Sequence, residues 1–258
     1  MTKEKKATII YLIVTFFLCC ICYCIFFIAG ENASAILALL IFSPALVAVI
    51  IRIIFYKKEP VLGFKVCRFK YILLAILIPL VYLGVSYGSF LVSTPAAFTG
   101  ELSSISIISF IVEIFSGILL VMGEEIGWRG FLLPRLDLLL GQRRAIIING
   151  LIWALLHFPL MIAGLYPNGT PLWYQLPMFT VEAILITAIM AYLRFRSGSL
   201  WPVILLHESH NYIDQQLCTP LTQSANSAYF AGETGILTVL CTIVIVIIIY
   251  RKKPNKPF

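Results

Sequence analysis

Residues 105–130 read ISIISFIVEIFSGILLVMGEEIGWRG, a long apolar run that closes on two adjacent carboxylates and an arginine. The apolar part is long enough to cross the roughly 30 Å hydrocarbon core of a bilayer as a helix. Glu124 and Glu125 are costly at the end of such a helix, so we expect them to face the interior of a helix bundle and to take part in function. The stretch therefore predicts a membrane helix that carries a site.

The composition of the whole chain extends this prediction. Of 258 residues, 60% are hydrophobic and 12% are charged, whereas about a quarter of the residues in soluble domains are charged. Apolar segments long enough to span a membrane as helices cover residues 7–29, 35–56, 71–94, 105–128, 145–165, 172–193, 199–217 and 235–250. We therefore predict an all-α, polytopic membrane helix bundle of about eight transmembrane helices, formed by a single integral-membrane domain over residues 1–258.

The basic residues predict the orientation of the bundle. Of the 19 Lys and Arg residues, 18 lie before the first segment, after the last, or in connections that follow even-numbered segments, and Arg52 lies near the end of the second segment, next to such a connection. By the positive-inside rule, both termini and these connections are cytoplasmic. The net charge of +7 then reflects topology and attraction to anionic membrane lipids. Nucleic acid is not an expected partner.

The charged residues after the fourth segment have a helical spacing. Glu125 and Arg129 are four residues apart, so they lie on one helix face and can neutralise each other in a low dielectric. Glu124 points about 100° away from that face. The spacing predicts a structural ion pair between Glu125 and Arg129, with Glu124 left to act. The alternative is that all three residues end a helix at the cytoplasmic surface, where charges cost little.

Two later segments carry the histidines. Trp153 and His157 are one turn apart in the fifth segment, and His207 and Asn211 are one turn apart in the seventh. The run HESHN at 207–211 nearly matches the zinc-protease helix motif, but Asn211 occupies the place of its second histidine. A lone histidine in a membrane helix is more often an interhelical hydrogen-bonding residue than a catalyst. Together, however, the motifs predict one catalytic cavity between helices 4, 5 and 7.

The order of these motifs resembles a known family. Glu124-Glu125-x3-Arg129, then Trp153-x3-His157, then His207-x3-Asn211, on separate membrane helices, is similar to the intramembrane CPBP family. That family contains the CAAX-processing endopeptidases and Abi-like bacterial relatives linked to bacteriocin self-immunity. By motif, the resemblance covers about residues 105–215, the expected catalytic core. One departure is that the second motif commonly has Phe where this chain has Trp153.

The resemblance implies peptide hydrolysis inside a membrane, here most simply a bacterial cell membrane. Hydrolysis of an amide needs a base that activates water and donors that stabilise the oxyanion. Glu124 is the expected base, and His157 is expected to hold the water and protonate the leaving amine. His207 and Asn211 are placed as oxyanion donors. The expected substrate is a peptide or a prenylated or otherwise lipidated protein. Supporting positions are Glu125, Arg129 and Trp153.

Other readings of the same residues stay open. Glu124, His157 and His207 could hold zinc or another divalent metal with an open water position, which is typical of catalytic zinc. The same three residues also suit a metal-free mechanism, although the family is usually labelled a metalloprotease. A non-catalytic membrane immunity protein could keep this fold. A proton-coupled transporter would also keep carboxylates in the membrane, but the sequence has no internal repeat of the kind common in transporters.

Overall fold

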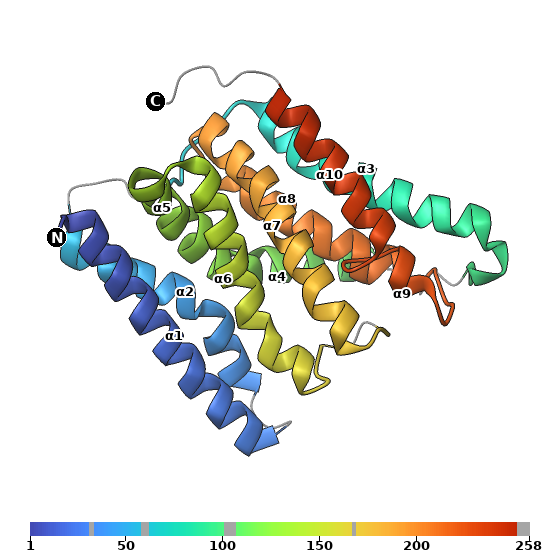
Figure 1. Ribbon diagram of the computed structural model, residues 1–258, viewed down its shortest axis with the longest axis horizontal. Coiled ribbons are helices and arrows are strands. Elements are labelled where there is room, and N and C mark those ends of the chain that lie inside the picture. The colour runs from blue at the N-terminus through green and yellow to red at the C-terminus, as the bar shows by residue number, and fades with distance from the viewer. Residues whose placement is uncertain (31–33, 58–61, 101–106, 167–168, 252–258) are drawn as a thin grey trace.

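The computed structural model describes residues 1–258 apart from 31–33, 58–61, 101–106, 167–168 and 252–258. The described part is a bundle of α-helices (Figure 1), as predicted, and helices lie in all eight of the predicted segments. Six of these are long and apolar enough to cross a membrane, so the chain is an integral membrane protein. They are α1 (Lys3–Ala29), α2 (Ser34–Phe55), α3 (Phe69–Ser93), the run Ile107–Leu140, α6 (Gln142–Ile162) and α7 (Leu172–Ser197).

The last two predicted segments do not form long α-helices like the other six. The helix α8 (Trp201–Asn211) continues into a π-helical segment, η4 (Tyr212–Cys218). After the short helix α9 (Ser227–Phe230), the chain forms α10 (Ile236–Arg251), an apolar helix of 16 residues. Both α8 and α10 pack against α3 and α7. They are therefore part of the bundle, and α10 is shorter than the roughly 20 residues of a full span.

The fourth segment does not end where the sequence predicts. The helix α4 (Ile107–Glu125), the π-helical η3 (Ile126–Leu132) and α5 (Leu133–Leu140) follow one another in a run of 34 residues. Pro134 follows η3 directly without ending the run, although proline has no backbone N–H to donate to the preceding turn. The α-helical part of the segment does end on the glutamate pair, but the predicted end of the helix at residue 128 is wrong, because the helical run continues to Leu140. Glu124 and Glu125 lie near the middle of the run.

The helix α2 packs closely against this part of the run. A Cβ atom added to Gly127 would lie 2.4 Å from Cβ of Pro44 and 2.6 Å from the hydroxyl of Tyr11. A Cβ atom on Gly123 would lie 3.0 Å from the ring of Phe42. Small residues allow membrane helices to approach each other in this way. The glycines thus bring α2 against the helix that carries the two glutamates.

The helices form neighbouring pairs across the bundle. In Figure 1, α1 and α2 run side by side at one edge, α6 and α7 lie in the middle, and α10 and α3 lie at the other edge, and the contacts between these helices agree. Large apolar side chains such as Phe17, Val81 and Leu119 stay exposed on the outer faces, as expected where the surrounding solvent is lipid. The polar groups instead gather where α4, η3, α6, α7 and α8 meet.

Candidate active site

Glu125 and Arg129 form a fully buried ion pair. Nη1 of Arg129 donates to Oε1 of Glu125 at 2.8 Å, and both side chains are 0% exposed. Nη2 of Arg129 donates to Oγ1 of Thr187 on α7 at 2.7 Å. The guanidinium also lies over the ring of Trp153, 4.4 Å from its centre, which adds a cation–π contact. The pair predicted from the spacing is therefore present, and it lies inside the bundle rather than at the surface.

Trp153 on α6 connects the other polar residues. Its Nε1 donates to Oε2 of Glu124 at 2.7 Å. Its ring centre lies 5.7 Å from the ring of His157 and 5.3 Å from the ring of His207, and it is nearly perpendicular to both. A phenylalanine at this position could make the ring contacts but could not donate to a carboxylate. The departure from the common motif thus gives Glu124 a hydrogen-bond donor.

The hydrogen bond of His157 determines its tautomer. Nδ1 of His157 lies 2.9 Å from the backbone carbonyl of Trp153. A carbonyl oxygen only accepts, so Nδ1 carries the proton, and in the neutral ring Nε2 has a free lone pair. The rings of Phe179 and Tyr166 pack around His157 at 5.2 and 6.0 Å between centres. These aromatic neighbours, which the motifs do not indicate, fix the orientation of the imidazole.

His207 on α8 binds the second glutamate of the pair. Its Nδ1 lies 2.9 Å from Oε1 of Glu125, the same oxygen that receives Arg129. The sequence assigned Glu125 to Arg129 alone, but this carboxylate also orients His207. Asn211 lies one turn further along α8 and is partly buried. In the described part of the chain, no hydrogen bond joins Asn211 to the other predicted site residues.

The remaining polar residues of α8 and α7 point to other helices. Nδ1 of His210 lies 2.6 Å from the hydroxyl of Tyr82 on α3. The carboxyl of Glu208 packs against Gly117 on α4, where any side chain would collide with it. Glu182 accepts a hydrogen bond of 2.7 Å from Thr242. These contacts join helices to one another. The candidate active site is therefore the cluster around Trp153, which contains Glu124, His157 and His207.

The donor set does not form the metal site that the sequence leaves open. Within the described ranges, no three His, Cys, Asp or Glu side chains come together in a way that could hold one ion. One oxygen of Glu124 is instead bound by Trp153, and Nδ1 of His207 is turned to Glu125. The described side chains are thus arranged for hydrolysis by water and protein groups.

These features define a class of protein: an integral membrane protein with carboxylates and imidazoles buried together between its helices. Residues 105–213 match the family described as type II CAAX prenyl endopeptidase Rce1-like. This part of the chain is a domain of that family, and the resemblance to intramembrane CPBP proteases is confirmed. The family implies an intramembrane protease that acts on prenylated proteins. No curated protein matches the chain.

Proposed function

We propose that this protein is an endopeptidase that hydrolyses a peptide bond in a membrane-associated or lipidated peptide or protein. The observation that carries the proposal is the set of contacts made by Trp153. It bonds Glu124 and packs against His157 and His207. A carboxylate and two imidazoles around one ring are the groups that water-activated amide hydrolysis needs. The catalytic core would be residues 105–215 within a single membrane domain.

Glu124 and His157 carry the proton transfers. With Oε2 held by Trp153, Oε1 of Glu124 is the oxygen that takes a proton from water while the water oxygen bonds to the substrate carbonyl carbon. The proton then reaches the leaving nitrogen through Nε2 of His157 as the carbon–nitrogen bond breaks. One water is consumed, and an acid and an amine are released.

His207 and Asn211 stabilise the oxyanion in this scheme. Because Nδ1 of His207 is turned to Glu125, only its Nε2 can face the substrate. Nε2 donates only when the ring is an imidazolium, in which both nitrogens carry protons. Glu125, itself anchored by Arg129, is the counter-charge for that imidazolium, in the way that a buried aspartate supports a catalytic histidine in serine proteases. Asn211 supplies a second, neutral donor.

The positive-inside rule supports an orientation for this scheme. We propose that both termini and the basic connections lie on the cytoplasmic side of a bacterial cell membrane. The C-terminal ends of α2 and α7, which carry Arg52, Arg194 and Arg196, then face the cytoplasm. The α6–α7 connection and the segment between η4 and α10 face the opposite side. The substrate is a peptide or lipidated protein that reaches the cluster within the bilayer.

Comparison of peptide products tests the proposed function. Membrane peptides from cells that contain the native protein are compared by mass spectrometry with those from cells that contain Glu124→Gln. In parallel, purified protein in lipid nanodiscs is incubated with a farnesylated peptide that ends in a CAAX sequence. We expect products that depend on Glu124 in at least the cellular comparison. Identical peptide profiles and an intact farnesylated peptide would contradict the proposal and favour a non-catalytic immunity protein.

Chelation distinguishes the water-only scheme from metal-dependent hydrolysis. Because the described donors do not converge on one point, cleavage in nanodiscs is expected to proceed at an unchanged rate after treatment with 1,10-phenanthroline. The measurement compares initial rates before and after chelation and after addition of zinc. Loss of activity that zinc restores would show that a metal takes part.

The donor on Trp153 gives a second test. Trp153→Phe keeps an apolar ring near both histidines but removes the hydrogen bond to Oε2 of Glu124. A hydrogen bond to a charged group contributes about 1.5–3 kcal/mol, so we expect kcat to fall about 10- to 100-fold. Trp201→Phe, at a position on α8 with a partly exposed side chain, is the matched control. An unchanged kcat for Trp153→Phe would show that Glu124 needs no such anchor.

A further inference from the structure

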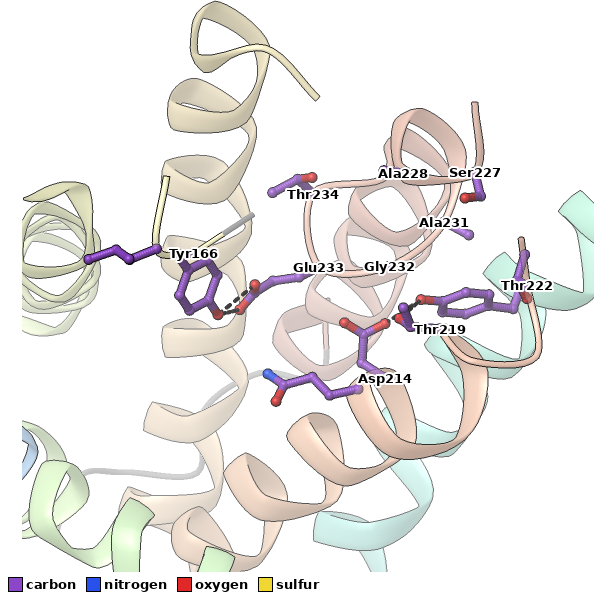
Figure 2. Close-up of a pocket in the computed structure, with 13 residues that line it drawn as sticks. Tyr166, Asp214, Thr219, Thr222, Ser227, Ala228, Ala231, Gly232, Glu233 and Thr234 are labelled. Atoms are coloured by element: carbon purple, nitrogen blue, oxygen red, sulfur yellow. Dashed lines mark hydrogen bonds between the residues drawn. The ribbon is translucent and has the colours of Figure 1, made fainter. Parts of the chain in front are cut away.

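A cavity of about 360 Å³ lies beside the candidate active site. Figure 2 shows its walls, which come from the α6–α7 connection, η4 and the segment that precedes α10. Tyr166 connects the cavity to the site, because its ring lies 6.0 Å from that of His157 and its hydroxyl donates to Glu233 at 2.8 and 3.0 Å. The volume falls within the range of organic ligand pockets, about 300–1,000 Å³, and exceeds the space that a single ion needs.

Two carboxylates face this cavity, Asp214 from η4 and Glu233 from the segment before α10 (Figure 2). Tyr87 on α3 donates to Oδ1 of Asp214 at 2.6 Å, and the backbone N–H of Glu233 also donates to the Asp214 carboxylate. Gly232 makes this approach possible, because its φ is +85° and a Cβ atom there would lie 2.9 Å from the hydroxyl of Tyr87. Hydroxyl and amide donors thus hold both carboxylates in place.

No positively charged side chain lines the cavity beside these carboxylates. The residues that line the cavity include no lysine, arginine or histidine, and neither carboxylate forms an ion pair within the described residues. The sequence from Ser197 to Tyr250 has no lysine or arginine at all. Carboxylates held in a cavity without a counter-charge are stabilised by a bound cation.

A third group in the wall has no protein partner. Thr222 lines the cavity and is 5% exposed, and its hydroxyl makes no hydrogen bond to any described residue. A buried hydroxyl without a partner costs free energy, and a hydroxyl oxygen can accept from an N–H group. Gln215 and Thr219 at the rim are exposed, so the cavity is reached from the surface. The cavity thus offers two carboxylates, a buried hydroxyl and an entrance.

We propose that this cavity is a subsite for a cationic side chain, an ammonium or guanidinium group, of the peptide that is cleaved at Glu124. The proposal rests on the proposed function, because it assumes that the bound peptide is cleaved at Glu124. Tyr166 contacts both His157 and Glu233, so the cavity lies next to the candidate active site. A guanidinium or ammonium group has several N–H donors for Asp214, Glu233 and Thr222. The absence of a three-donor metal group among the described residues favours an organic cation over a metal ion.

A binding experiment tests the subsite without depending on cleavage. Fluorescein-labelled Ala/Leu peptides with one arginine at successive positions are titrated with the Glu124→Gln protein in nanodiscs, and a second set replaces the arginine with citrulline, its uncharged counterpart. At one or a few positions, we expect the arginine peptide to bind roughly tenfold more tightly or better. Equal affinity of the two sets at every position would overturn the proposal, whether or not the native protein cleaves a peptide.

Substitution of the two carboxylates locates the effect. In Asp214→Asn/Glu233→Gln, the preference for arginine over citrulline should disappear, while the affinity for the citrulline peptide stays within about twofold. These amides keep the shape of the side chains and remove only their charge. Asp137→Asn, a carboxylate on α5 that does not line the cavity, should keep the preference. An arginine preference that survives in the double variant would also overturn the proposal.

The same preference is expected to depend on pH. Burial raises the pKa of Glu233 to about 7, and the charge of Asp214 adds to this, while the hydrogen bond from Tyr166 opposes it. At longer range His207 lowers the pKa and Glu124 raises it. Because only the ionised carboxylate attracts a cation, the arginine preference should grow as the pH rises from about 6 to about 8. A preference that weakens over this range would contradict the assignment of Glu233.

Discussion

Glu124→Gln is expected to lower the rate of peptide cleavage by about 10²- to 10⁴-fold, the usual contribution of a general base. The amide can still accept the hydrogen bond from Nε1 of Trp153, so the geometry around Glu124 is kept. What it loses is the ability to take a proton from water. The measurement is kcat for peptide cleavage in nanodiscs, together with the unfolding midpoint of the variant.

The matched control is a carboxylate of the same helical run. Asp137 lies on α5 and is partly exposed, and Asp137→Asn removes one negative charge without touching the cluster. We expect this control to keep kcat within about twofold, in line with the small effect of distant surface substitutions. A Glu124→Gln protein that folds normally and cleaves at the native rate would exclude Glu124 as the base.

Arg129→Ala is expected to destabilise the protein by about 3–5 kcal/mol, the cost of leaving a buried charge without its partner. Glu125 is 0% exposed, and one of its oxygens already lacks a partner among the described residues. Removal of Arg129 also ends the bond to Thr187 and the contact with the ring of Trp153. The measurement is the free energy of unfolding in mixed micelles with increasing SDS.

Two further variants separate charge from packing. Thr187→Val removes one hydrogen bond of the charged Arg129 and is expected to cost about 1.5–3 kcal/mol, less than Arg129→Ala. Glu125→Gln/Arg129→Met removes both charges, so it should be more stable than Arg129→Ala. The cleavage rate of this double variant should nevertheless be low, because His207 loses its charged partner Glu125. If Arg129→Ala unfolds at the same SDS concentration as the native protein, the pair does not hold the site together.

The sequence predicts the bundle and the composition of the site, because both depend on regular helical spacing. The four-residue spacing of Glu125 and Arg129 leads directly to their ion pair. By contrast, the bond from Trp153 to Glu124 depends on how α6 is rotated against α4, and the pairing of His207 with Glu125 depends on the depth of α8. A single sequence contains neither quantity. Asp214 and Glu233 belong to no motif, and only the fold brings them to one cavity.

The unbroken course from α4 into α5 was also not predictable. A π-helical segment has the same residue types as an α-helix and differs only in its hydrogen bonds, which join residues five apart. The sequence around Gly127 and Gly130 therefore reads as the end of a helix. The structure shows instead that the glycines accommodate neighbouring chain, since a Cβ atom on Gly130 would lie 3.2 Å from the backbone carbonyl of Leu62.

The π-helical segment η3 has a consequence for the length of the chain. An α-helix turns about 100° per residue, so one residue deleted between Ile126 and Leu132 would turn everything that follows by about that angle. Phe131 and Leu136, both buried, would swing away from their neighbours, and the start of α6 would shift with them. Glu125 and Trp153 lie on opposite sides of this segment. The count of residues between the motifs, as well as their identity, is thus constrained by the fold.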